Sequence, residues 1–401
     1  MAKKILVIGG GHGGLFTALE LAGSGEVTLV SDTDYFCFKP LLYEYLSGEV
    51  EAWHIAPYYK ELFDEEINFI KAKVDNIDFT ANSVKLSSRK DAINYDVLVL
   101  AVGGVTNFWN VKGAEEFALP FRNIADADAL RKRMISAVDE VSPTVSTNLT
   151  FAIVGGGASG VELATKMSDL LYDAYQQRGL QGEPNIMLLE MGDRLVPGMG
   201  TDMRKIVEKS LRDCKVSIHT KTRVLEVKSG GIISEFDGKQ TETKVAGTIW
   251  VAGVKPNPLL ETLDLEKNSG RLVLAEATLQ AKGKENVFVL GDIAFVENVA
   301  PILLGTAQLA NQEATLLAEN IKLFLNDRSL KTKDFEELGE ALSLGTENAA
   351  VLVAGNAVSG DIARKARFAL YSSRLPTWHH RLKVGSDWFF NGTSPNSLGL
   401  G

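Results

Sequence analysis

Cysteine is scarce in this chain of 401 residues, and its scarcity excludes several classes of protein. Only Cys37 and Cys214 occur, far apart and without a C-x-x-C motif. This excludes a zinc ribbon and a local dithiol pair. Two isolated thiols are typical of a protein made in a reducing compartment. We therefore expect both thiols to be reduced, and we expect no metal site.

Long hydrophobic runs are also missing. No segment reaches the roughly 18 consecutive apolar residues of a membrane-spanning helix. The N-terminal "MAKKILVIGG" has a basic start, but its apolar run is shorter than the roughly 7–15 residues of a signal-peptide core. Hydrophobic residues make up 45% of the chain and charged residues 23%, as in folded globular proteins. The length predicts two or three domains.

An excess of positive charge is lacking as well, except near the C-terminus. The net charge of −9 describes a surface that is not suited to nucleic acid. Residues 361–390 reverse the sign, with six basic residues against two acidic ones, and their C-terminal part carries the aromatic side chains of Trp378, Trp388, Phe389 and Phe390. Aromatic and basic residues together favour a membrane interface. We expect this segment to contact a membrane, with a second copy of the chain as the alternative partner.

Proline and glycine divide this basic segment. Pro376 and Gly385 interrupt the run, and both residues disfavour a continuous helix. We therefore expect two short helices here rather than one spanning segment.

Glycine is abundant near the N-terminus, where it forms a phosphate-binding pattern. The apolar strand Ile5–Ile8 runs directly into Gly9-x-Gly11-x-x-Gly14, and a helical pattern follows. The first glycine permits a tight turn, the second lets the backbone approach a pyrophosphate, and the third lets the helix pack against the strand. This arrangement predicts a dinucleotide-binding unit.

The same pattern occurs a second time. A strand at Phe151–Val154 leads into Gly155-x-Gly157-x-x-Gly160 and then into another helix. The following strand, "NIMLLE", ends on Glu190. A carboxylate there can accept both ribose hydroxyls of NADH and would repel the 2′-phosphate of NADPH. Two such units predict two bound dinucleotides.

Three later strands also end in glycine. "YDVLVLAVGG" ends at Gly103, "GTIWVAGVKPNP" bends at Gly253, and "NVFVLGDIA" ends at Gly291 followed by Asp292. Glycine permits close approach of a ligand, and the aspartate offers a hydrogen-bond acceptor.

This ordered set resembles the flavoproteins with two dinucleotide-binding domains, which include the glutathione reductase-like enzymes. The resemblance implies that the first cradle and the Gly-Asp strand bind FAD and that the second cradle binds NADH, with NADPH as the alternative. The implied FAD contacts are Gly9, Gly11, His12, Gly13, Gly14, Lys39, Gly103, Gly291, Asp292, Ala307 and Gln308. The implied nicotinamide-cofactor contacts are Gly155, Gly157, Ala158, Ser159, Gly160, Glu190 and Gly253.

One position departs from the family pattern. The family usually carries an acid at the end of the second strand of the FAD domain, where this sequence has Ser31, with Asp32 one residue later. We expect one of these two side chains to hold the FAD ribose.

Two further stretches resemble the type II NAD(P)H:quinone oxidoreductases. These are "FCFKPLLYEYLSGEV" and "PILLGTAQLANQEA". Gln308 and Gln312 are four residues apart on a predicted helix and share one face. We expect Ala307, Ala310 and Ala314 to lower that face so that a quinone ring can approach. The resemblance also implies that Glu162 lies near the flavin and relays protons or positions the quinone.

Both ends of the chain resemble the plastid and cyanobacterial branch of that family, which includes the demethylphylloquinone reductases. The shared elements are SGEV-x-x-W-x-IAP and RLPT-x-x-H-R-x-KVG-x-x-WF. The resemblance implies a peripheral enzyme on the cytoplasmic side of a membrane that reduces a quinone. A ferredoxin reductase-like enzyme and a non-catalytic NADH-binding sensor are the alternatives.

Together these elements predict an α/β protein with two Rossmann-like domains of the glutathione reductase type. The FAD domain would comprise residues 1–110 and 255–330, with a connection at 111–144 and the nicotinamide domain at 145–254. Residues 331–401 would form a strand pair around 341–355 and then the basic helices of a membrane-associating region.

Overall fold

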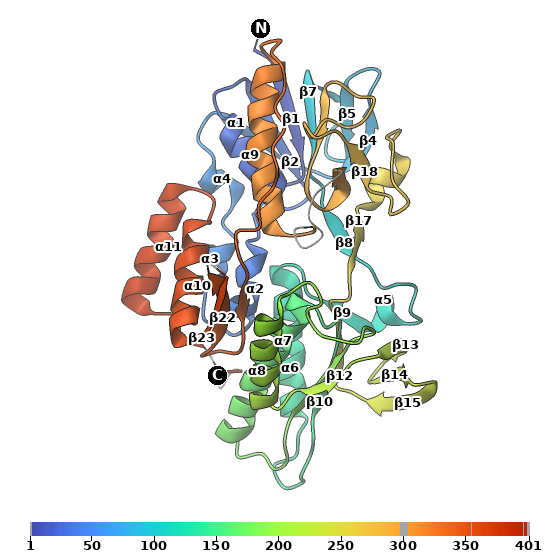
Figure 1. Cartoon of the computed structure of the whole chain (residues 1–401), viewed down its shortest axis with the longest axis vertical. Helices are drawn as coiled ribbons and strands as arrows, with labels where there is room; N and C mark the ends of the chain where they lie inside the picture. The colour runs from blue at the N-terminus through green and yellow to red at the C-terminus, as the bar shows by residue number, and fades with distance from the viewer. Residues whose placement is uncertain (1, 297–303, 354, 396, 399–401) are drawn as a thin grey trace. The chain divides into compact units, whose positions relative to one another are not determined.

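The computed structural model describes residues 2–296, 304–353, 355–395 and 397–398 (Figure 1). Residues 301–303, at the start of the "PILLGTAQLANQEA" stretch, lie outside this set. By internal packing the chain divides into two units. Unit 1 comprises Met1–Phe38, Ala56–Val105 and Lys255–Leu338, and unit 2 comprises Lys39–Ile55, Thr106–Val254 and Gly339–Gly401. The domain limits expected from the sequence stay predictions.

A five-stranded parallel sheet forms the centre of unit 1. Its order is β19-β7-β1-β2-β3, with bounds β1 (Lys4–Ile8), β2 (Glu26–Ser31), β3 (Ile67–Lys71), β7 (Val97–Leu100) and β19 (Val287–Val289). Every residue of β7 is buried, as expected for a parallel strand covered on both faces. Helices α1 (His12–Leu21) and α9 (Ala307–Phe324) pack against each other.

Smaller elements complete unit 1. An antiparallel sheet consists of β4 (Val74–Asp78), β5 (Ser83–Leu86) and β6 (Ile93–Asn94). A parallel pair consists of β18 (Val273–Ala275) and β20 (Ala294–Val296). The short helices are α4 (Tyr59–Leu62), η2 (Pro258–Thr262) and η3 (Gly291–Ile293). Two of the points where the chain passes between the units lie in β8 (Gly104–Thr106) and β17 (Val254–Pro256).

Unit 2 has a second five-stranded parallel sheet. Its order is β12-β11-β10-β16-β9, with bounds β9 (Ala118–Pro120), β10 (Thr150–Val154), β11 (Asn185–Leu189), β12 (Ser217–His219) and β16 (Gly247–Trp250). The longer helices are α6 (Ile124–Asp139), α7 (Ala158–Gln177) and α8 (Thr201–Asp213). The shorter ones are η1 (Lys39–Leu41), α2 (Leu42–Leu46), α3 (Ala52–Ile55) and α5 (Ala114–Phe117). The prediction of an α/β protein with two dinucleotide-binding cores is confirmed.

The C-terminal part of unit 2 differs from the expectation in two respects. It has three antiparallel strands instead of a pair, β21 (Ala341–Ser343), β22 (Ala349–Val353) and β23 (Asn356–Gly360). Two helices follow, α10 (Asp361–Ser373) and α11 (Trp378–Asn391). Pro376 lies between them as predicted, but Gly385 lies inside α11. Thr377 caps α11 by accepting a hydrogen bond from the His380 N–H, and packing of the inner face offsets the low helix propensity of one glycine.

Polar and aromatic contacts attach α11 to the helix α3. The His54 Nδ1 accepts hydrogen bonds from the Glu51 N–H and the Trp388 Nε1–H, so its Nε2–H donates to Asp387 at 2.9 Å. The His380 Nε2 bonds the His54 carbonyl. Trp388 is therefore an anchor of the helix, which corrects its assignment to the membrane-contacting set. No helix among the described residues is long and apolar enough to cross a bilayer.

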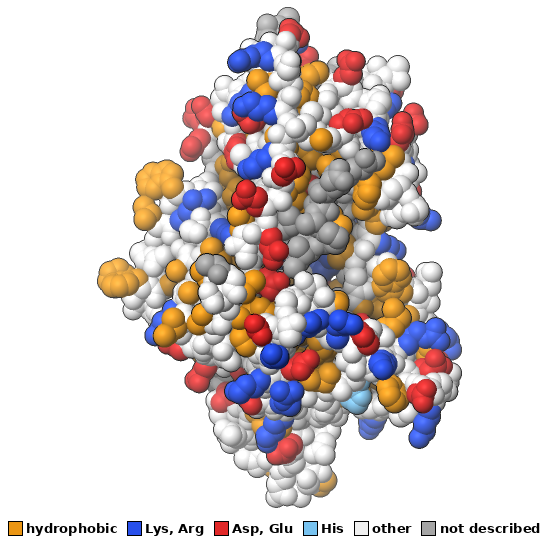
Figure 2. All heavy atoms as spheres, in the orientation of Figure 1, with side chains coloured by type: hydrophobic (Ala, Val, Ile, Leu, Met, Phe, Trp, Pro, Cys, Tyr) orange, Lys and Arg blue, Asp and Glu red, His pale blue; other side chains and the backbone are white. Residues whose placement is uncertain are grey.

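The outer side of α11 carries large apolar side chains. Trp378, Leu382, Phe389 and Phe390 are between 61% and 83% exposed. Figure 2 shows large hydrophobic side chains projecting over α11. Trp378, Leu382 and Phe389 recur at helical spacing, so they share one face.

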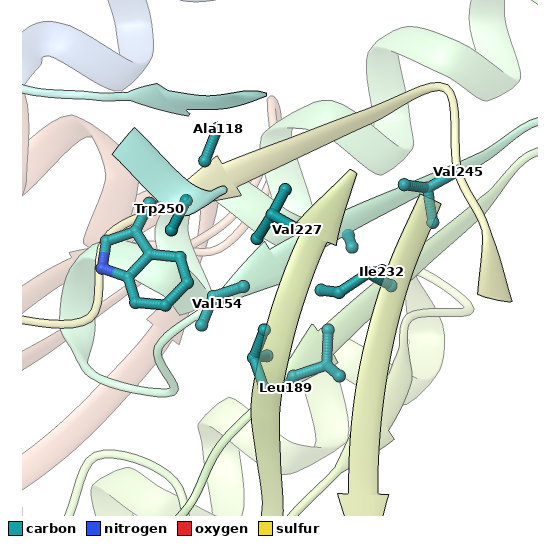
Figure 3. Packing of buried hydrophobic residues seen from close by; sticks show 10 residues of the cluster. Ala118, Val154, Leu189, Val227, Ile232, Val245 and Trp250 are labelled. Carbon is teal, nitrogen blue, oxygen red and sulfur yellow. The ribbon is translucent and has the colours of Figure 1, made fainter. Parts of the chain in front are cut away.

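A second antiparallel sheet covers the nucleotide-binding sheet of unit 2. It consists of β13 (Thr222–Lys228), β14 (Gly231–Phe236) and β15 (Lys239–Lys244). Figure 3 shows Val227, Ile232 and Val245 packing toward Val154, Leu189 and Trp250, all of them buried. This core supports the ends of β10, β11 and β16, where the second glycine cradle begins.

Candidate functional site

The first glycine cradle follows β1 in unit 1. Gly9 has φ +106°, a conformation that side chains disfavour. A Cβ at Gly14 would overlap the carbonyl oxygen of Gly9, whereas a Cβ at Gly11 would have no atom within 4 Å. Two glycines therefore close the turn, and Gly11 faces open space that a pyrophosphate would fit. His12 and Gly13 begin α1 and are buried, with Gly13 against Leu290.

The second cradle, in unit 2, repeats this geometry. Gly155 has φ +116°, and a Cβ at Gly160 would overlap the Gly155 carbonyl oxygen. A Cβ at Gly157 would again meet nothing within 4 Å. Ala158 and Ser159, both half-buried, form the first residues of α7. The residues present thus fit a dinucleotide at the helix N-terminus in both units.

Strand register shows that Ser31 and Glu190 occupy equivalent positions. The Gly9 N–H donates to the Val30 carbonyl, and the Gly155 N–H donates to the Leu189 carbonyl. Ser31 and Glu190 each directly follow the residue that accepts this hydrogen bond. The Glu190 carboxylate accepts the N–H groups of Gly156 at 2.7 Å and Gly192 at 2.6 Å. These two bonds hold both carboxylate oxygens in place and leave lone pairs for ribose hydroxyls.

Ser31 and Asp32 differ in exposure. The Ser31 side chain is buried and accepts a hydrogen bond from the Thr33 N–H. Asp32 is exposed. Which of the two holds a ribose stays a prediction.

The later strand ends of unit 1 gather near the first cradle. A Cβ at Gly103, which has φ +62°, would lie 4.0 Å from the Asp292 Oδ2. The Gly291 N–H donates to the Glu313 Oε2 at 2.7 Å. Burial, with a contribution from the Asp292 charge, raises the pKa of Glu313 to about 8. Glu313 adjoins the glutamines singled out in the sequence, but no motif distinguished it.

Gln308 and Gln312 are both on α9, as predicted, and bond the chain segment 336–338. The Gln308 Oε1 accepts the Leu338 N–H at 2.7 Å. Gln312 accepts the Glu336 N–H and donates to the Glu336 carbonyl.

The prediction that small residues share the helix face of Gln308 and Gln312 is wrong. Ala310 and Ala314 are buried. Ala310 is two residues from each glutamine, which is about 200° around the helix axis. Ala307 and Thr306 begin the helix, where the Thr306 hydroxyl caps the Leu309 N–H. Lys39 is exposed at the start of η1 in unit 2.

Glu162 belongs to a buried cluster of charges in unit 2. Its Oε1 accepts the Ser343 N–H at 2.8 Å and the Arg367 guanidinium at 3.0 Å. The same guanidinium donates to Glu44 at 2.7 Å and to the Pro40 carbonyl at 2.8 Å. Arg367 is one of the six basic residues of the segment 361–390 that the sequence predicts to contact a membrane, but it is 2% exposed and so does not face a membrane.

Lysine and glutamate side chains extend the cluster. The Lys166 ammonium lies 3.5 Å from Glu44 and forms a closer ion pair with Glu49. Glu49 also accepts the Ser47 hydroxyl and lies 3.8 Å from Arg364, which is 22% exposed at its side chain. Sequence reasoning missed Glu44, Glu49 and Lys166. The two glutamates lie in one stretch and the lysine in a distant one, and no spacing indicates that their side chains meet.

Burial controls the protonation of this cluster. Desolvation raises the pKa of Glu162 to about 7, with Arg367 opposing the shift and Glu44 adding to it. Desolvation also raises the pKa of Glu49, against the attraction of Lys166. For Glu44 the attraction of Arg367 and Lys166 outweighs desolvation and lowers the pKa. The cluster can therefore hold a proton at Glu162 near neutral pH.

A pair of alanine substitutions tests the first cradle. Gly11→Ala should leave the thermal unfolding midpoint of the FAD-free protein unchanged while reducing bound FAD, because its methyl group enters the open space. Gly14→Ala is the matched control, and it should destabilise the fold by about 1–3 kcal/mol, because its methyl group overlaps backbone. Flavin per chain and melting curves give both readouts. A Gly11→Ala protein with full, tightly held FAD would contradict the cradle geometry.

Glu162→Gln tests the raised pKa. A carboxyl whose folded-state pKa lies above its ordinary value of 4.5 stabilises the fold fully below pH 4.5, and this contribution is lost as pH rises through about 7. The unfolding midpoint of Glu162→Gln relative to wild type should therefore rise between pH 5 and pH 8. Glu116→Gln, at an exposed position of α5, is the control. A pH-independent difference would mean that Glu162 has an ordinary pKa.

Comparison with known proteins places this fold and its motifs in one family. The family model of pyridine nucleotide-disulphide oxidoreductases matches residues 3–314. The chain is 34% identical to the demethylphylloquinone reductase of Synechocystis sp., over 96% of this chain and 95% of that protein. It is 32% identical to the alternative NAD(P)H-ubiquinone oxidoreductase C1 of Arabidopsis thaliana, over 96% and 80% of the two chains.

Solved structures share the fold. NDH2 of Plasmodium falciparum in complex with NADH has a TM-score of 0.86 at 17% identity, with 98% of this chain and 99% of that chain covered. The sulfide:quinone oxidoreductase of Aquifex aeolicus has a TM-score of 0.78 at 22% identity, with 98% and 96% covered. As the motifs predicted, the chain belongs to the pyridine nucleotide-disulphide oxidoreductase family and, within it, to the type II NAD(P)H:quinone oxidoreductases near the demethylphylloquinone reductases.

Proposed function

We propose that this protein is an NAD(P)H:quinone oxidoreductase that binds FAD in the cradle of unit 1 and NADH in the cradle of unit 2. The observation that carries the proposal is the repeated geometry, in which Gly11 and Gly157 each open onto space while their flanking glycines close the turn. FAD, when bound, supplies a two-electron carrier between a nicotinamide and a quinone.

The chain's own residues bind and orient these groups. In unit 1 the N-terminus of α1 would hold the FAD pyrophosphate, Ser31 or Asp32 the ribose, and Asp292 a polar part of the flavin chain. In unit 2 the N-terminus of α7 would hold the NADH pyrophosphate and Glu190 the adenosine ribose.

The quinone is proposed to be a membrane naphthoquinone such as demethylphylloquinone. The support is the 34% identity to a protein of that name across nearly the whole chain. Gln308 and Gln312 remain the proposed quinone-side residues, and Glu162 the proposed proton donor.

Steady-state turnover tests the proposal directly. The purified flavoprotein should oxidise NADH with short-chain naphthoquinones and benzoquinones and should be inactive with a ferredoxin. Activity with ferredoxin alone would identify the ferredoxin reductase-like alternative. Binding of FAD and NADH without turnover of any acceptor would identify a redox sensor.

The two half-reactions separate the roles of the glutamines. Gln308→Ala should slow quinone reduction about tenfold or more and spare flavin reduction by NADH, since the proposed NADH cradle of unit 2 is unchanged. Gln312→Ala removes both hydrogen bonds to the Glu336 backbone. It therefore serves as the comparison for effects that come from loosening the segment 336–338. Stopped-flow absorbance of the flavin resolves the two steps. Equal slowing of both steps in Gln308→Ala would assign it to the flavin site.

Glu190 is proposed to set the preference for NADH. Glu190→Gln should shift the ratio of kcat/KM for NADPH over NADH upward by about tenfold, because it removes the charge that repels a 2′-phosphate, an effect of about 1–3 kcal/mol. Glu183→Gln, at an exposed site of the same unit, is the control. A wild-type preference for NADPH would refute the assigned role.

The outer face of α11 is proposed to rest on the cytoplasmic side of a membrane. It presents four exposed apolar side chains, and Lys365 and Lys383 are exposed on α10 and α11. Lys383 also lies over the Trp53 ring at 4.7 Å. A helix with apolar and cationic groups on its outer surface suits an anionic lipid interface. A homodimer contact is the alternative use of this face.

Liposome flotation tests the membrane contact. The double variant Phe389→Ser/Phe390→Ser should lose most binding to anionic liposomes and retain its melting temperature, because both rings are at least 80% exposed. Phe236→Ser, at a 56% exposed ring of β14, is the matched control. Wild-type protein that ignores anionic and neutral liposomes, yet forms a dimer that the double variant lacks, would assign the face to self-association.

A further inference from the structure

Trp109 has a strained backbone and an exposed side chain. Its φ is +52°, and the next residue, Asn110, has φ +55°. Asparagine tolerates this region, but a bulky aromatic residue rarely occupies it. The Trp109 side chain is nevertheless 64% exposed, so burial of the indole does not account for the strain. Strained residues of this kind concentrate at functional sites.

One hydrogen bond holds the indole, a second holds the backbone of its turn, and a glycine lies beside the ring, all within unit 2. The Trp109 Nε1–H donates to the Ala252 carbonyl at 2.6 Å. The Trp109 N–H donates to the Asn107 Oδ1 at 3.0 Å, which caps the turn. Gly253 has φ +112°, and a Cβ there would approach the Trp109 Nε1 to 3.0 Å. The glycine therefore leaves room for the ring.

These contacts place the indole at the nicotinamide end of the second cradle. Ala252 packs directly on the first cradle glycine, since a Cβ at Gly155 would lie 2.9 Å from the Ala252 Cα. Strand β16 adjoins β10 on the side opposite β11. In this fold a dinucleotide crosses the carboxyl ends of the strands at the point where strand order reverses. With the adenosine half at Glu190, beyond β11, the other half extends over the end of β16.

We propose that Trp109 is a binding residue for the nicotinamide half of the dinucleotide, on whose flat ring the exposed indole packs. The inference rests on the proposed NADH site in unit 2. It assigns to Trp109 the binding of the planar nicotinamide ring, at the end of the site opposite Glu190. The Nε1 hydrogen bond fixes the indole plane, so little side-chain freedom is lost on binding. The strained turn presents the ring instead of burying it.

Isothermal titration of the FAD-loaded protein with NAD⁺ and with ADP-ribose tests the proposal without turnover. Both ligands carry the adenosine half, but only NAD⁺ carries the nicotinamide ring. Trp109→Ala should weaken NAD⁺ binding about tenfold, as expected for loss of one aromatic stacking partner, and should leave ADP-ribose binding unchanged. Trp378→Ala, at another exposed tryptophan, should change neither.

A glycine variant keeps the test informative if alanine disturbs the turn. Trp109→Gly accepts the positive φ without strain, so its melting temperature should equal or exceed that of wild type while NAD⁺ binding is weakened. Equal weakening of NAD⁺ and ADP-ribose, or unchanged binding of both, would overturn the assignment to Trp109 and leave the cradle intact. Wild-type protein that binds neither ligand would instead overturn the proposed NADH site and the inference with it.

Discussion

The buried guanidinium of Arg367 is the interaction on which unit 2 depends. It joins three stretches that are distant in sequence, because it bonds Glu44 of α2, Glu162 of α7 and the carbonyl of Pro40 from its own position on α10. Removing an ion of this kind from water costs several kcal/mol, which only full pairing repays. Loss of one partner would leave a buried charge unpaired. The interaction therefore specifies how α2, α7 and α10 are arranged more than it adds to stability.

The charge balance of this cluster has a chemical consequence. Three carboxylates, Glu44, Glu49 and Glu162, are buried with two fully buried cations, Lys166 and Arg367. Arg364 lies 3.8 Å from Glu49, also pairs with Asp361 outside the cluster and remains partly exposed. A buried cluster with one excess negative charge raises the pKa of a carboxyl, so that one carboxylate binds a proton. The arrangement thus favours the protonated form of Glu162, the residue for which the family resemblance implies a role near the flavin and the quinone.

Local patterns predicted the parts of this structure that depend on backbone shape. Short stretches of sequence were enough to predict the two glycine cradles, the strands before them and the helix that carries the glutamines. In the cradles, the positive φ or the close backbone contact at each turn allows only glycine. The buried charge cluster could not be predicted in the same way, since Glu44, Lys166 and Arg367 meet only after three separate segments pack. For the same reason Arg367 was grouped with surface cations, and Trp388 with the exposed aromatics.

Errors at Gly385 and on α9 have a related cause. A glycine disfavours a helix by about 1 kcal/mol, but the contacts of His380, Asp387 and Trp388 with α3 hold the inner face of α11 on both sides of Gly385. On α9, helical spacing correctly placed Gln308 and Gln312 together, yet it could not show that residues 336–338 return to bond both of them. Long-range pairing decides both cases.

Ser31 and Glu190 occupy equivalent positions in the two units but carry different chemistry. In unit 1 the Gly9 N–H bonds the Val30 carbonyl, and in unit 2 the Gly155 N–H bonds the Leu189 carbonyl, so the residue that follows has the same position in both units. In unit 2 that place holds a carboxylate already fixed by Gly156 and Gly192. In unit 1 it holds a small hydroxyl that is buried beside the Tyr59–Gly10 hydrogen bond. We expect the ribose of each dinucleotide to bind near this position, where the backbone fixes the place of the side chain and the residue type determines its hydrogen bonding.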